Sequence, residues 1–109
     1  MAALALNFTN TLLNTQQTVY TSPVGGLGTR IDSFTATNNS AIDSSYLAYI
    51  DNGISDNVPT IPFRIVVSGN VDLGIGLVNQ TLPAGAALKI QSSSIGEIYF
   101  TISGVDLDN

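Results

Sequence analysis

The chain has 109 residues, the length of one compact domain. It carries three basic and eight acidic residues for a net charge of −5, and charged residues make up only 10% of it. Three scattered cations cannot follow the phosphates of a nucleic acid or bind an anionic membrane surface, so neither partner is expected. Cysteine and histidine are absent, which excludes disulfides, thiolate metal sites and the commonest general base of enzymes.

Uncharged polar residues take the place of the missing charges, because Ser, Thr, Asn and Gln occupy 36 of the 109 positions. Such a surface suits a protein whose faces are covered by neighbouring molecules. The first residues, MAALALNF, contain no basic region, so we expect no secretory signal and synthesis in the cytoplasm. No stretch reaches the ~18 apolar residues that a membrane helix needs.

Apolar and polar residues alternate with period two in short segments that turn residues separate, which predicts β-strands. The first four segments span residues 4–13, 15–21, 29–37 and 45–51. In the third, Phe34 and Ala36 should lie on one side of the strand, and Thr35 and Thr37 on the other. The fourth has apolar side chains pointing in both directions, which predicts burial on two faces.

A long loop is expected over residues 52–62, because a glycine and two prolines interrupt any strand ladder there. Four further strands are predicted over residues 63–68, 71–79, 86–92 and 97–103. Alternation in the first of these places one set of side chains toward the core, namely Phe63, Ile65 and Val67. Arg64 and Val66 should then face outward.

The later segments carry clear signals of their own. Gly74 and Gly76 predict a bend or a bulge within residues 71–79. Leu88 and Ile90 should face inward. The last strand is the most regular, and its predicted inward residues are Ile98, Phe100 and Ile102. Residues 104–109 are polar and are expected to form a loose tail.

Eight short strands joined by hairpin turns predict an all-β fold, an antiparallel β-sandwich. A jelly-roll-like arrangement is the first choice and an immunoglobulin-like sandwich is the alternative. No internal repeat or composition shift divides the chain, so residues 1–109 are expected to form a single domain.

No catalytic site and no cofactor are predicted. The carboxylates do not pair across a plausible cleft, and a hydroxyl nucleophile would lack a histidine base. The loop over residues 51–57 offers the oxygen ligands Asp51, Asn52 and Asp56, which is a weak candidate site for a hard cation. The same residue types are also those that any turn prefers, so we predict no metal site.

Two groups of residues are candidates for binding. The four tyrosines could form a carbohydrate-stacking platform or cover the sandwich edges and an interface; they are Tyr20, Tyr46, Tyr49 and Tyr99. The chain start is apolar and uncharged, and such a segment is sticky unless it is covered. Residues 1–10 are therefore predicted to be an edge strand or an arm that adds to a partner's sheet. The predicted interface residues are Ala2, Ala3, Leu4, Ala5, Leu6 and Tyr20.

Several segments resemble small virion proteins of tailed bacteriophages. The matching elements are "YTSP" at residues 20–23, "IDSFTATNNS" at 31–40, "LPAGAALKI" at 82–90 and "IYFTISGV" at 98–105. The proteins they resemble are capsid decoration (cement) proteins, and also collar, head–tail connector or head-fibre components. The resemblance implies a β-sandwich protomer of the virion that forms a homodimer or homotrimer and binds the major capsid protein or neck proteins. A carbohydrate- or receptor-binding module is the more distant alternative.

Overall fold

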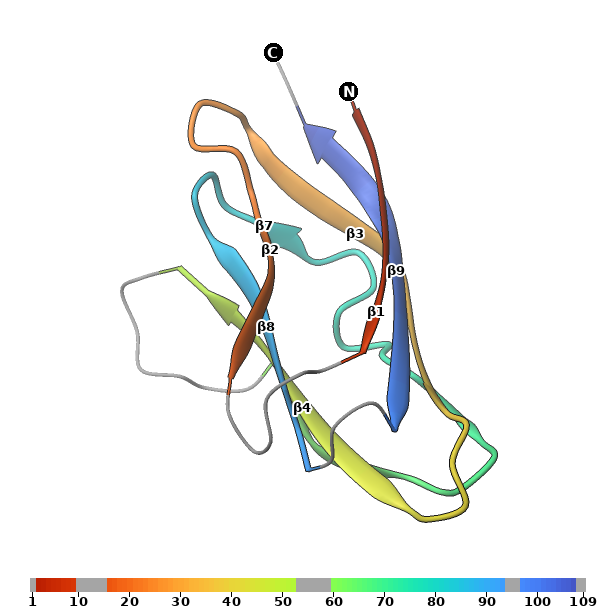
Figure 1. The fold of residues 1–109 in the computed structure, drawn as a ribbon. Coiled ribbons are helices and arrows are strands. Elements are labelled where there is room, and N and C mark those ends of the chain that lie inside the picture. The colour runs from red at the N-terminus through yellow and green to blue at the C-terminus, as the bar shows by residue number, and fades with distance from the viewer. Residues whose placement is uncertain (1, 10–15, 53–59, 94–96, 108–109) are drawn as a thin grey trace.

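The computed structural model describes residues 2–9, 16–52, 60–93 and 97–107. These residues form two antiparallel sheets packed face to face, which confirms the predicted all-β sandwich (Figure 1). The strands are β1 (Ala2–Thr9), β2 (Gln17–Thr21), β3 (Gly28–Asn38), β4 (Ser44–Asp51), β5 (Ile61–Val66), β6 (Val71–Leu73), β7 (Thr81–Leu82), β8 (Ala87–Ser92) and β9 (Ile98–Leu107).

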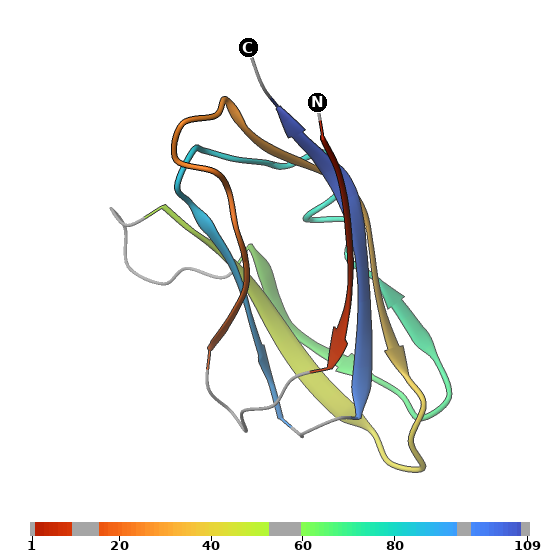
Figure 2. The same cartoon turned by 45° about the horizontal axis from the view of Figure 1, so that its top comes forward.

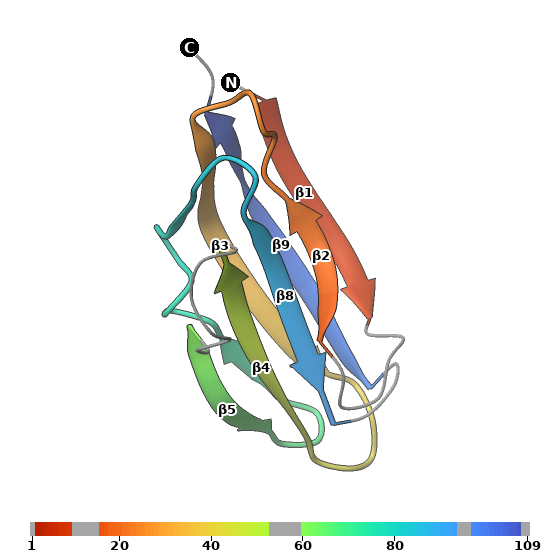
Figure 3. The ribbon, with the colours of Figure 1, turned by 90° about the vertical axis from the view of Figure 1, so that its left-hand side faces the viewer.

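The strand order of the two sheets defines the two margins of the sandwich. The larger sheet has the strand order β1-β9-β3-β6, with β7 also paired to β3, and the smaller sheet has the order β2-β8-β4-β5. Figure 2 shows the two layers side by side, with β1, β9 and β3 in one and β2, β8 and β4 in the other. One margin of the sandwich is therefore bounded by β1 and β2, and the opposite margin by β5 and β6 (Figure 3).

The core lies between the sheets and is organised by three aromatic rings. The ring of Tyr46 in β4 lies 5.9 Å from that of Phe34 in β3 and 5.5 Å from that of Phe100 in β9. All residues predicted to face inward on β8 and β9 are buried, namely Leu88, Ile90, Ile98, Phe100 and Ile102. Phe34 and Ala36, which were predicted to share one side of their strand, are both buried as well. The two-sided burial expected for the fourth predicted strand is confirmed by Ala48 and Tyr49, adjacent residues of β4 that are both buried.

The predicted facing of the fifth strand is wrong for Ile65, Val66 and Val67, whereas the side chain of Phe63 lies outside the described part of the chain. Val66 is 2% exposed and belongs to the core, whereas Ile65 is 60% exposed. The cause is a β-bulge, because Ala48 pairs with Ile61 while Tyr46 pairs with Arg64, so β5 uses one residue more than β4 over this stretch. Because side chains alternate between the two faces of a strand, one inserted residue after Ile61 reverses the faces of all the residues that follow it in β5. The strand also begins within the segment predicted to be a loop.

The segment predicted as one strand over residues 71–79 is mostly a turn. Only β6 is strand, and a second short strand, β7, lies between this segment and the next predicted strand. β6 ends just before Gly74, where a bend or bulge was predicted. This position requires glycine, because a Cβ there would lie 2.2 Å from Cδ1 of the buried Phe34 ring. The chain leaves the sheet at this point and returns to β3 through β7.

The tail expected to be loose from residue 104 is also a correction, because β9 continues through Leu107 and pairs with both β1 and β3. Opposite it, β3 contains a bulge, since Ile31 pairs with Gly104 and Ser33 pairs with Ser103. The extra residue, Asp32, lets both Ile31 and Phe34 face the core. The close approach requires glycine, because a Cβ at residue 104 would lie 2.1 Å from the Arg30 carbonyl oxygen.

Candidate functional site

An exposed apolar strip runs along the margin formed by β5 and β6. Five aliphatic side chains within eleven residues are between 51% and 79% exposed, namely Ile65, Val67, Val71, Leu73 and Ile75. A shallow hollow is lined by Ile65, Val67 and Val71, and a second hollow beside it is lined by Leu73 and Ile75. Five exposed aliphatic side chains along one margin offer apolar surface that another molecule can cover.

The strip exists because of two local features of the chain. The bulge in β5 turns Ile65 outward, and Val67 follows it on the same side. In β6, Asp72 points toward the interior of the margin, so its neighbours Val71 and Leu73 point outward. This surface was not predicted from the sequence. Pro62 was the available signal, since a proline within a sheet lies on an edge strand or at a bulge.

Beneath the strip, a polar cluster holds the two sheets together. The Tyr46 hydroxyl of the smaller sheet donates a 2.5 Å hydrogen bond to Oδ2 of Asp72 in the larger sheet. Arg64 places its Nη2 2.7 Å from Oδ1 of the same carboxylate. Burial, and then the Asp72 carboxylate, raises the pKa of the Tyr46 phenol. The cluster satisfies both carboxylate oxygens and anchors the strip to the sandwich.

A second cluster of the same kind joins the sheets near the opposite margin. The Tyr20 hydroxyl of β2 donates to Oδ1 of Asp106 in β9, and the Thr29 hydroxyl donates to the same oxygen at 2.7 Å. The Thr29 and Ser22 hydroxyls are also hydrogen-bonded, at 2.8 Å. Burial and the hydrogen bond to Asp106 raise the pKa of the Tyr20 phenol. Tyr20 was predicted as an interface residue, and the structure shows its hydroxyl turned toward its own sheets.

All three cations of the chain are held in ion pairs. They are Arg30 with Asp32, Arg64 with Asp72 and Lys89 with Asp51, each at 2.7 Å. A nucleic-acid backbone or an anionic lipid surface would have to break one of these pairs to gain a contact. The other five acidic residues account for the net charge of −5.

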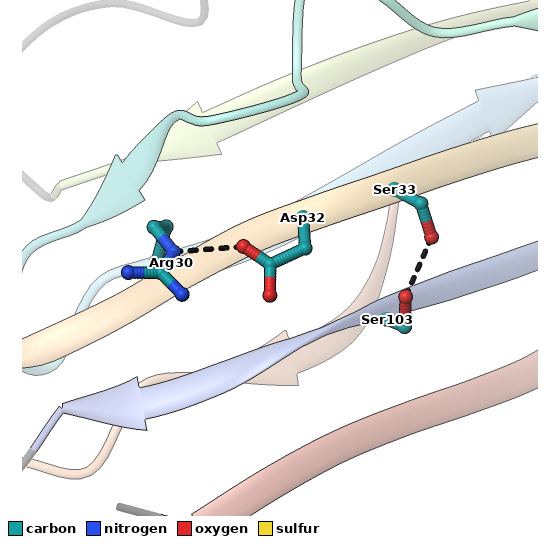
Figure 4. Close-up of polar contacts among 4 residues, drawn as sticks. All are labelled: Arg30, Asp32, Ser33 and Ser103. Carbon is teal, nitrogen blue, oxygen red and sulfur yellow. Dashed lines mark hydrogen bonds and ion pairs between the residues drawn. The ribbon is translucent and has the colours of Figure 1, made fainter.

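Figure 4 shows a small polar group on the outer face of β3 and β9. Arg30 reaches Asp32, and the Ser33 and Ser103 hydroxyls lie 2.5 Å apart. A serine nucleophile needs a base within hydrogen-bond reach of its hydroxyl. Here the Asp32 carboxylate faces Arg30, and the two serines face each other. The group therefore ties the bulge of β3 to β9 and presents no activated nucleophile.

The candidate cation loop is only partly within the described residues, since Asp56 lies outside them. Asp51 ends β4, and its Oδ2 is 2.7 Å from the Lys89 ammonium, which already neutralises it. Asn52 follows as an exposed residue. Across the four described ranges, no three metal-ligating acidic, histidine or cysteine side chains gather. None of the described residues forms a helix long and apolar enough to cross a membrane.

The tyrosines do not gather into an exposed platform. Tyr46 and Tyr49 are buried, Tyr20 is half-buried, and only Tyr99 is exposed, at 51%. Carbohydrate stacking requires aromatic faces that are open together. The Tyr46 ring instead packs in the core between the two sheets.

The predicted N-terminal interface segment forms β1, an edge strand of the chain's own larger sheet. It pairs with β9 from Ala2 opposite Asp106 to Thr9 opposite Tyr99. Leu6 packs against the core, while Ala3 and Ala5 are exposed. The segment is thus an edge strand in the described chain, and its role as an interface stays a prediction.

No family model, curated protein or solved structure matches the chain. The resemblance to small virion proteins therefore stays a prediction that rests on the sequence segments alone.

Proposed function

We propose that this chain is a non-enzymatic structural protein of a tailed-bacteriophage virion, a capsid decoration protein that stabilises the head by bridging capsid subunits. The observation that carries the proposal is the apolar strip of Ile65, Val67, Val71, Leu73 and Ile75. A sandwich with an open apolar margin and only 10% charged residues is suited to lie in a seam between protein subunits.

The size of the strip agrees with a modest docking surface. Burying a whole aliphatic side chain is worth roughly 1.5–3 kcal/mol, so covering the exposed parts of these five side chains is worth roughly 5–9 kcal/mol. That gain is comparable to the cost of association, so one strip alone would bind weakly. Binding at many seams of an assembled shell stabilises the shell by mass action, because only the assembled form offers the site.

The direct test is co-sedimentation with expanded empty capsids of the phage that encodes the chain. The unaltered protein should saturate the shells at a fixed ratio and raise the temperature at which they disassemble. Leu73→Ser should weaken this binding by about tenfold, because the interface loses roughly 1.4 kcal/mol of binding free energy from buried apolar surface. Leu27→Ser is the matched control, because Leu27 is 59% exposed in a loop away from the strip and Leu73 is 60% exposed.

Other outcomes would redirect the proposal. Binding to purified neck or tail assemblies and not to shells would place the protein in the head–tail connector or collar, the closest alternative. Equal binding by the two leucine variants would remove the strip from the argument. Failure to bind any virion assembly would refute the virion role.

A further inference from the structure

The outer edge of β1 is an open strand edge. All eight residues of β1 pair with β9 in one unbroken register, and β1 is the terminal strand of its sheet (Figure 3). A terminal strand presents a row of backbone N–H and C=O groups that can pair with another strand. Within the described ranges, no strand occupies this edge.

The other edge strands, β2, β5, β6 and the two-residue β7, carry features that discourage pairing. β2 has an irregular register between Thr18 and Tyr20. β5 contains Pro62, a bulge and the charged Arg64, and β6 is only three residues long. Natural sheets protect their edges with these same devices. β1 has none of them, since its sequence AALALNFT lacks proline and charge and its register has no shift.

The distribution of charge points to a second copy of the chain as the occupant. Two copies of a protein with a net charge of −5 repel each other, so they can meet most easily where charge is absent. Residues 1–29 contain no charged side chain, and they include both β1 and β2, the two strands that bound this margin. Asp106 lies opposite Ala2 at one end, and its carboxylate is bound by Tyr20 and Thr29.

We infer that two copies pair β1 with β1 antiparallel about a two-fold axis near Ala5, joining their larger sheets into one. The side chains of β1 permit this arrangement. Ala3, Ala5 and Asn7 are exposed on the outer face, while Leu4 and Leu6 are half-buried on the core side. An axis through Ala5 places exposed residues opposite exposed ones and Leu4 opposite Leu6, so the alternation continues across the interface. The two Asp106 carboxylates then lie at opposite ends of the paired strands.

The dimer supplies what bridging requires. β1 and β6 are at opposite ends of the strand order, so pairing through β1 leaves both apolar strips free on the outer margins. Two linked strips bind adjacent subunits more tightly than one, because the second contact becomes intramolecular. This consequence rests on the proposed function, whereas the pairing itself does not.

The test is the molar mass of the purified full chain by light scattering, compared with that of two lysine variants. The unaltered chain should have a molar mass twice that of a single chain. Ala5→Lys should raise the dimer dissociation constant by about tenfold or more, because it places like charges opposite each other in paired strands. Ala41→Lys is the control, since it makes the same substitution at an exposed residue of the loop between β3 and β4 and should leave the dimer intact.

Circular dichroism shows whether each variant is folded, and Ala3→Lys replaces Ala5→Lys if the latter is not. An unaltered chain that is monomeric at high concentration, or an Ala5→Lys dimer as tight as the original, would overturn the inference. The two proposals fail separately. A monomer that still saturates shells refutes only the β1 pairing, and a dimer that ignores every virion assembly refutes only the virion role.

Discussion

Gly104→Ala should be among the most destabilising single-methyl changes in this chain. A Cβ at this position would lie 2.1 Å from the Arg30 carbonyl oxygen and 3.1 Å from Cα of Ile31, both parts of the β3 backbone. Ordinary contact begins at 3.4 Å, so β3 would have to move away from β9 by more than 1 Å at its bulge. Backbone cannot rotate aside as a side chain can, so the pairing must open locally.

The expected loss follows from what that opening breaks. Two backbone hydrogen bonds at about 1 kcal/mol each are lost, and part of the burial of Ile31 goes with them at about 1–2 kcal/mol. We therefore expect Gly104→Ala to lower the free energy of unfolding by about 3–4 kcal/mol, a large part of the 5–15 kcal/mol typical of a domain. Ile31 is 1% exposed, which is why its displacement matters.

Equilibrium unfolding in urea, followed by circular dichroism, measures this loss. Gly25→Ala is the control, because a Cβ there meets nothing within 4 Å, and its effect should stay within about 0.5 kcal/mol. If Gly104→Ala lowers stability by less than about 1 kcal/mol, the two strands are not as close at the bulge as described. The explanation of the buried Ile31 and Phe34 by this bulge would then fail.

Three further outcomes are expected. Tyr46→Phe should cost about 2 kcal/mol in urea unfolding, because it removes the donor to the Asp72 carboxylate, and Tyr20→Phe should cost less because Tyr20 is half-buried. Since burial and Asp72 raise the folded-state pKa of Tyr46 above its unfolded value, the folded state holds the proton longer, and stability should fall as the pH rises above about 10. Tyr46→Phe should flatten that fall, and an unchanged slope would contradict the assignment. Millimolar calcium should leave the melting temperature unchanged, because Lys89 already neutralises Asp51, and a clear calcium-dependent rise would restore the cation site.

Strand positions were predictable where the alternation is regular and local. Ile98, Phe100 and Ile102 show this best, since all three are buried as their spacing predicts. The prediction failed where one extra residue enters a strand. The bulge in β5 reversed the side chains of Ile65 and Val66, because a bulge is a property of two paired strands and leaves little trace in either one alone.

Of the two candidate binding surfaces, one was visible in the sequence and the other was not. The uncharged start of the chain was visible in the composition, and it was correctly identified as unusual. Its place as a terminal strand beside β9 was one of two alternatives, since the pairing joins residues nearly a hundred positions apart. The apolar strip was missed, because Val71 becomes a neighbour of Ile65 only when their two edge strands are placed on the same margin of the sandwich.

The sequence by itself determined the all-β class, the faces of the regular strands and the confinement of all charge to residues after the first 29. These follow from the order of side chains along the chain and need no partner strand. Only the tertiary structure decided the registers, the bulges of β3 and β5, and which strands bound the sheets. Those features arise from hydrogen bonding and packing between distant segments, and the exposed strip and the open β1 edge depend on them.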